Sequence, residues 1–243
     1  MPITAFAFAI ILACMHIFAK NMRFIQIIPR SRFLSLGGGV SVGYVFIHVL
    51  PELKEHQELI EHHGLLLSYL EHHAYLLAML GLILFYVLEK TAKESQRQNQ
   101  QETGENQPTR SIFWLHISSF ACYNGLIGYL LIHRETEGLV SLILYVIAMS
   151  LHFIVVDYGL RTHHKDIYNR VGRWVLALAV LMGWAIGAIT EIPEAVLALF
   201  FAFLSGAIIL NVLKEELPED RESSTLAFSL GALGYIALLL VVS

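Results

Sequence analysis

Apolar residues fall into eight long runs separated by shorter polar stretches. A helix that crosses a membrane needs roughly 20 mostly apolar residues. The runs lie at residues 3–19, 33–51, 74–89, 112–132, 139–160, 173–190, 193–213 and 224–243. This pattern predicts an all-α, polytopic membrane protein with eight transmembrane helices. Lys20 and Arg23 follow the first run and nothing basic precedes it, so we expect a retained span rather than a signal peptide.

Composition agrees with this pattern. The chain has 243 residues, of which 56% are hydrophobic and only 15% charged, and its mean hydropathy is +0.61. A soluble domain of this size would expose too much apolar surface, so the composition excludes that class. Cys14 and Cys122 both fall in predicted spans and give no sign of a disulfide. We expect a plasma membrane protein, and for a short chain without a targeting segment the bacterial inner membrane.

Basic residues are distributed very unevenly between the predicted loops. The loops after the first, third, fifth and seventh spans hold fourteen Lys and Arg residues, whereas Lys54 and Arg134 alone lie on the opposite side. Cytoplasmic loops carry the excess of basic residues in membrane proteins. We therefore expect both termini outside the cytoplasm, which also favours an even number of spans.

A polar segment divides the chain. Residues 90–111 are rich in Gln, Glu and Asn, which predicts a solvated cytoplasmic linker. The expected order is thus three helices in 1–89, the linker, two central helices in 112–160, and a cytoplasmic loop followed by three helices in 161–243. We describe this order as a 3+2+3 arrangement.

A short pattern occurs twice, once in each outer set of helices. Both copies open with a glycine, carry a polar residue nine positions later, and reach Leu-Pro-Glu twelve positions later; the matched pairs are Gly39 and Gly206, His48 and Glu215, Pro51 and Pro218. Coincidence is an alternative, because Leu-Pro-Glu commonly ends an apolar helix. The predicted topology runs the two copies in opposite directions, which makes them an inverted repeat of the kind that transporters use.

Glycines one helical turn apart occur in two of the spans. Gly39 and Gly43 lie in the second, and Gly183 and Gly187 in the sixth. Such pairs let another backbone come close. Packing alone explains them as well as a role in transport does.

The predicted external loop, residues 52–73, is rich in histidine and glutamate. His62, His63, His72 and His73 lie among carboxylates, and imidazole with carboxylate is a plausible ligand set for Zn²⁺ or a similar divalent ion. We predict that these histidines capture metal ions outside the membrane. An amphipathic helix resting on the lipid surface is the alternative, and the two are compatible.

The two central spans carry polar groups that a bilayer normally rejects. His116 and Asn124 lie in the fourth span and His152 in the fifth, and by helix rise Asn124 and His152 fall near the same depth. Polar residues at such depth mark a functional site by default. We predict that His152 and Asn124 meet, with His116 as a further metal ligand. Asp157 precedes Arg161 by one turn, which favours a salt bridge between them.

These features together resemble the ZIP (Zrt/Irt-like) family of divalent-metal transporters. The resemblance rests on the eight spans, the long cytoplasmic loop after the third, the GxxxGxxxxHxLPE pattern from Gly39 to Glu52, and the glycine-to-ELPE pattern in the seventh span. It covers nearly the whole chain. The resemblance implies that the fourth and fifth spans hold the metal ion through a His-x-x-x-Asp/Glu-Gly motif and a His-Glu-x-Pro-x-Glu-type motif.

The chain departs from the family motifs at several ligand positions. In the fourth span Gly125 matches, while Asn124 replaces the carboxylate and Phe120 the histidine. In the fifth span His152 and Gly159 match, and the remaining motif positions are taken by Phe153, Val155 and Val156. The resemblance therefore implies a reduced, neutral central site, with His48 near the outer end and Glu215 or Glu216 near the inner end of the path.

The sequence thus predicts a transporter that moves Zn²⁺ or another divalent cation as its substrate. No bound prosthetic group and no nucleic-acid partner are expected; the lipid bilayer is the main partner, and a homodimer is compatible with the pattern. A sensor or scaffold that has lost transport is the alternative. We do not expect an enzyme: a zinc hydrolase built on His116, His152 and Asp157 would lack the HExxH motif.

Overall fold

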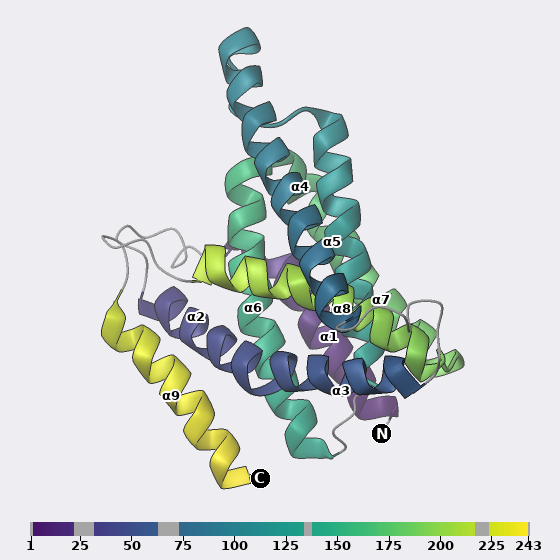
Figure 1. Cartoon of the computed structure of the whole chain (residues 1–243). Helices are drawn as coiled ribbons and strands as arrows, with labels where there is room; N and C mark the ends of the chain where they lie inside the picture. The colour runs from purple at the N-terminus through teal and green to yellow at the C-terminus, as the bar shows by residue number, and fades with distance from the viewer. Residues whose placement is uncertain (1, 22–31, 63–72, 134–137, 217–223, 243) are drawn as a thin grey trace.

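A computed structural model describes residues 2–21, 32–62, 73–133, 138–216 and 224–242, which are helical almost throughout and contain no strand (Figure 1). The α-helices are α1 (Pro2–Phe18), α2 (Arg32–Tyr44), α3 (Leu50–His62), α4 (His73–Thr103), α5 (Arg110–Leu130), α6 (Leu139–Ile167), α7 (Arg173–Ile189), α8 (Glu194–Asn211) and α9 (Thr225–Val242). The shorter helical segments are η1 (Ala19–Asn21), η3 (Val45–Val49), η4 (Tyr168–Gly172) and η5 (Val212–Glu216). A helix covers each of the eight predicted ranges, so the all-α prediction is confirmed.

Several helices have the length and character of membrane spans. Ser35–Ile60, His73–Thr103, Leu139–Ile189 and Glu194–Lys214 are long and apolar enough to cross a bilayer, and Ile3–Phe18 and Thr225–Leu240 are shorter apolar helices. Large apolar side chains cover the outer face of α4; these are Met79, Leu80, Ile83, Leu84, Tyr86 and Val87. A surface of this kind is suited to lipid and not to water. The chain is a helical membrane protein; the number of spans stays a prediction.

The helices pack as two groups, one of four and one of five helices, that differ from the order along the chain. In the first group α7 packs against α5 and α1, and α6 packs against α1. In the second group α2 packs against α9 and, through α3, against α8, which packs along α4. Each group therefore takes helices from both halves of the chain. We call the groups the α7 unit and the α8 unit.

The crossing of α2 with α9 is closed by a reciprocal pair of glycines. A Cβ atom at Gly39 would overlap the carbonyl oxygen of Phe228, and one at Gly231 would overlap that of Leu36. Each glycine contacts the carbonyl three residues before the other glycine. Only glycine permits the two backbones to lie this close.

The crossing of α4 with α8 has the same register. Gly206 faces the carbonyl oxygen of Ala78, and Gly81 faces that of Phe203. Again each glycine contacts the carbonyl three residues before its counterpart. The two crossings are thus equivalent, and each contains one glycine of the sequence repeat. The close backbone approach predicted for Gly39 and Gly183 is confirmed, because a Cβ atom at Gly183 would also overlap a backbone carbonyl oxygen, that of Gly125.

The repeat is also present in the form of the backbone. Beyond the crossing, α2 continues into the π-helical segment η3 and α8 into the π-helical segment η5. Each π segment begins six residues after the repeat glycine, at Val45 after Gly39 and at Val212 after Gly206. Single-turn π segments inside α-helices are rare and frequent at functional sites. A matched pair makes coincidence a poor explanation of the repeat.

The polar segment predicted as a linker is helical for most of its length. Helix α4 continues to Thr103 because its residues are good helix formers and the first breaker is Gly104, at φ 77°. Its exposed face bonds to the following loop, for example from Gln96 Nε2 to Asn106 Oδ1 at 2.8 Å. In Figure 1 this part of α4 projects from the top, whereas both chain ends lie at the bottom.

Much of the predicted external loop is helical as well. Residues 50–62 form α3, whose Leu53 and Ile60 are buried against Ala198 and Ala202 of α8. Leu59, one of the leucines expected to rest on the lipid surface, is partly buried against this cluster, and Leu65, Leu66 and Leu70 lie outside the described residues. This packing fixes α3 to the α8 unit.

Candidate functional site

Hydrogen bonds between α5 and α6 set the level of each polar group along the bundle. His152 Nε2 is 2.9 Å from Tyr123 Oη, and His116 Nδ1 is 3.0 Å from His164 Nε2. His116 and Tyr123 are seven residues apart on α5, which places them about 10 Å apart along its axis. His116 and His152 therefore lie at different levels. The predicted ligand set of His116, His152 and Asn124 does not come together around one ion.

The central level combines a satisfied histidine with an unsatisfied amide. Tyr123, Asn124 and His152 are each at most 2% exposed. The carboxamide nitrogen and oxygen of Asn124 have no hydrogen-bond partner among the described residues. The predicted meeting of His152 with Asn124 is therefore wrong as a hydrogen bond, because Tyr123 engages His152. Leaving a buried amide unpaired costs about 1–3 kcal/mol, so Asn124 needs a reason to be there.

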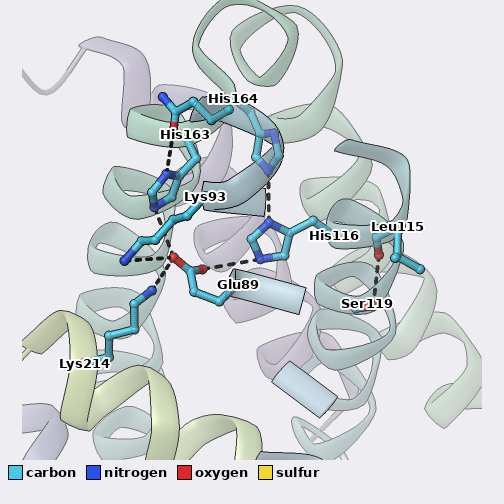
Figure 2. A network of polar contacts seen from close by, with 9 residues as sticks. Glu89, Lys93, Leu115, His116, Ser119, His163, His164 and Lys214 are labelled. Carbon is cyan, nitrogen blue, oxygen red and sulfur yellow. Dashed lines mark hydrogen bonds and ion pairs between the residues drawn. The ribbon is translucent and has the colours of Figure 1, made fainter. Parts of the chain in front are cut away.

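A second polar level surrounds Glu89 of α4 (Figure 2). Glu89 Oε1 lies 3.1 Å from His163 Nε2 and 3.6 Å from Lys93 Nζ, and it forms a short ion pair with Lys214 of η5. Glu89 Oε2 lies 3.7 Å from His116 Nε2. The carboxylate side chain is only 15% exposed. Side chains from four segments, α4, α5, α6 and η5, thus converge on one carboxylate, which we call the Glu89 cluster.

An outer set of polar groups orients the histidines of this cluster. His163 Nδ1 is 3.2 Å from Gln96 Oε1, and His116 Nδ1 is bonded to His164 Nε2. Sequence reasoning missed Glu89, His163, His164 and Lys214 as a group. A usable signal existed, because the four residues lie at or just beyond the ends of three predicted spans and all three ends were predicted to be cytoplasmic.

Asp157 has different partners from the one predicted. Its Oδ1 accepts hydrogen bonds from His16 Nδ1 at 2.9 Å and from the hydroxyl of Tyr168. Arg161 instead donates to the carbonyl oxygen of Ala19 at 3.0 Å. The predicted Asp157–Arg161 salt bridge is therefore wrong. Because His16 and Asp157 are 0% exposed, this pair ties α1 to α6 inside the α7 unit.

The predicted gate residues lie in the π segments η3 and η5. His48 belongs to η3 and is half-buried, with its ring centroid 5.2 Å from that of Tyr44 and 6.2 Å from that of Tyr235. Glu215 and Glu216 belong to η5, and their side chains lie outside the described part of the structure. The structure therefore places the predicted gates on equivalent backbone segments, and their role stays a prediction.

The histidines predicted to capture metal ions are only partly described. His73 is 3% exposed, and neither ring nitrogen has a hydrogen-bond partner among the described residues. This burial is at odds with direct capture from solution, and it arises because His73 begins α4 where the helix packs under α3. His63, His72 and the side chain of His62 lie outside the described residues.

Within the described ranges, no group of three or more His, Cys, Asp or Glu side chains is placed to hold a metal ion. No family model, no curated protein and no solved structure matches the chain. The resemblance to ZIP transporters therefore remains a prediction from the sequence. The arguments below depend on the repeat, the two units and the two polar levels.

Proposed function

We propose that the protein is a ZIP-like membrane transporter that moves a divalent metal cation, with zinc as the first candidate. The observation that carries this proposal is the inverted repeat, which recurs in sequence, in glycine register and in the position of the π segments. Transporters commonly place their site where two such repeats meet, and they alternate access by moving one part against the other. Both copies of the repeat lie in the α8 unit, so in this proposal the α7 unit moves against it.

Polar groups lie at several depths along the contact between the units. Tyr44 of the α8 unit faces Tyr145 of the α7 unit, with ring centroids 6.4 Å apart. Asn124 and His152 follow at the centre, and Glu89 contacts His116 across the units at the far end. In this proposal the ion passes these levels in turn, with His48 and Glu215 at the gates.

A neutral centre is compatible with transport. An ion must bind well enough to enter and weakly enough to leave, so a carboxamide and an imidazole serve as a transient site. The unpaired amide of Asn124 is then explained, because its oxygen is kept available as a ligand. The charge of the cation is offset at the Glu89 cluster.

The test is zinc uptake into proteoliposomes that contain the purified protein. We expect saturable uptake, and its loss in Asn124→Ala and His152→Ala. Ser119→Ala is the matched control on α5, because Ser119 Oγ bonds only the carbonyl of Leu115 in its own helix. Absence of uptake by folded wild-type protein, or full uptake by Asn124→Ala, would overturn the proposal.

One observation favours a second candidate, a ZIP-like sensor or scaffold without transport. His152 already has a partner in Tyr123, and Glu89 already has a cation in Lys214. Zinc stoichiometry measured on the same preparations separates the two candidates. Stoichiometric zinc without uptake supports a sensor, and neither zinc nor uptake supports a scaffold.

A further inference from the structure

We propose that Glu89, His116 and His163 form a divalent-cation site whose place is taken in this structure by the ammonium group of Lys214. The role of this site as a stage of ion passage rests on the proposed function, whereas its binding of a cation does not. Nothing in the sequence patterns assigned Glu89 or His163. The argument follows from spacing, hydrogen-bond direction and charge.

The distance from each histidine to Glu89 is close to the distance between two ligands of one small cation. Two ligands bound to the same tetrahedral Zn²⁺, each about 2.0–2.2 Å from it, stand about 3.3–3.6 Å apart. His163 Nε2 and Glu89 Oε1 are 3.1 Å apart, and His116 Nε2 and Glu89 Oε2 are 3.7 Å apart. These separations bracket the ligand spacing. As the three side chains now stand they are not placed to hold an ion, so binding requires them to rotate once Lys214 has moved away.

Hydrogen-bond direction indicates that a positive charge belongs between His163 and Glu89. Gln96 Nε2 donates to Asn106 Oδ1 at 2.8 Å, so Gln96 Oε1 is the acceptor that faces His163 Nδ1. A neutral His163 that donates through Nδ1 presents only a lone pair at Nε2. That lone pair faces the Glu89 carboxylate, and two acceptors at this distance repel unless the ring is protonated or a cation joins them.

The outer partners are those expected of metal-binding histidines. A ligating histidine usually engages a second group through its other ring nitrogen, which fixes the ring orientation. Gln96 does this for His163, and His164 does it for His116. Both rings therefore present Nε2 to Glu89 (Figure 2).

Lys214 occupies, in this conformation, the position beside Glu89 that a cation would take. Its ammonium contacts the same Oε1 that His163 faces. A lysine ammonium and a divalent cation cannot share one carboxylate oxygen without strong repulsion. Because Lys214 lies in η5 beside the predicted gate residue Glu215, withdrawal of η5 would free the site. The ion and the lysine therefore compete for Glu89.

The experiment is Co²⁺ binding by the full-length protein in detergent, followed by the visible absorption of tetrahedral Co²⁺. We expect Lys214→Met to bind Co²⁺ at least about tenfold more tightly than wild type, since one repelling charge is removed. Lys214→Arg keeps the charge and is expected to bind like wild type. Lys93→Met is the matched control and should bind Co²⁺ much like wild type. Lys93 also lies near Glu89, at 3.6 Å, but its side chain is 46% exposed, so water screens its charge.

A second substitution tests the ligands themselves. Adding Glu89→Gln or His163→Ala to Lys214→Met should abolish the gain in affinity. The proposal is overturned if Lys214→Met binds no more tightly than wild type, or if the gain survives loss of Glu89. Binding needs no transport, so the two ideas fail separately: tight Co²⁺ binding without zinc uptake sinks only transport, and uptake without tighter binding sinks only this site.

Discussion

The two equivalent crossings share a backbone and differ in chemistry. Eight residues beyond the glycines of the α4–α8 crossing stand Glu89 and Lys214, which form the ion pair at the centre of the Glu89 cluster. The same positions beyond the α2–α9 crossing hold Leu239 and Ile47. The glycine register therefore fixes how the helices cross, and the α5–α7 crossing at Gly128 and Gly183 shares it, whereas Glu89 and Lys214 lie beyond one crossing only.

An aromatic residue lies one helical turn beyond a glycine at each crossing. Phe85 of α4 packs on Phe120 of the α7 unit, with ring centroids 5.5 Å apart. The equivalent Tyr235 of α9 packs on His48 at 6.2 Å. Both copies use an aromatic ring to fill the space beside the crossing. An aromatic ring therefore lies beside each crossing, whereas the ionic cluster lies beyond the α4–α8 crossing only.

The largest effect is expected where the two crossings are alike. Gly231→Leu should lower the free energy of unfolding by about 3 kcal/mol or more, because the new side chain must displace the backbone of α2. Gly234→Leu on the same helix should change the free energy of unfolding little. Apart from the adjacent residues of α9, no described atom lies within 4 Å of a Cβ added there. Denaturant titration in detergent measures both. Equal stability of the two variants would refute the close crossing.

An intermediate effect is expected where the crossings differ. Glu89→Gln should cost about 2 kcal/mol of unfolding free energy, because it removes the partner of a largely buried ammonium. Glu94→Gln on the same helix breaks only the exposed pair with Lys90, at 3.7 Å, and should cost less than about 0.5 kcal/mol. Denaturant titration in detergent measures both changes in unfolding free energy. A cost for Glu89→Gln as small as that of the control would show that the cluster is merely a surface network.

The smallest effect concerns the neutral centre and has the opposite sign. Asn124→Leu should raise the free energy of unfolding by about 1 kcal/mol, because an unpaired buried amide is replaced by an apolar group of similar size. Tyr123→Phe, which removes a hydrogen bond from the same level, should lower it by about 1 kcal/mol. A loss of stability in Asn124→Leu would mean that the amide is bonded in the native state.

Hydrophobic periodicity and composition were sufficient to predict the helices. The sequence repeat identified one glycine of each crossing. The repeat pointed to Gly39 and Gly206, but their partners Gly231 and Gly81 could not be identified, because helix pairing depends on tertiary packing. The helical form of the linker was not predicted, since a polar helix and a polar loop have similar composition up to Gly104. Packing under α3 likewise buries His73, which the sequence pattern placed at the surface.

The polar site was predicted less well than the fold. His116 was expected to join Asn124 and His152 as a further metal ligand, because helix rise alone does not give the offset between neighbouring helices. The Tyr123–His152 and His116–His164 bonds supply that offset. The sequence identified Glu89 only as the last residue of a span. Its position at the centre of a polar cluster depends on how α4, α5, α6 and η5 pack together.

Accessibility of the central level tests transport most directly. In a chain with Cys14 and Cys122 replaced, Asn124→Cys would be exposed to a membrane-impermeant thiol reagent from each side of proteoliposomes in turn. Alternating access predicts labelling from both sides, slowed by zinc, although Asn124 is 1% exposed in this conformation. Labelling from neither side, in a folded protein whose exposed control cysteine reacts, would contradict the account.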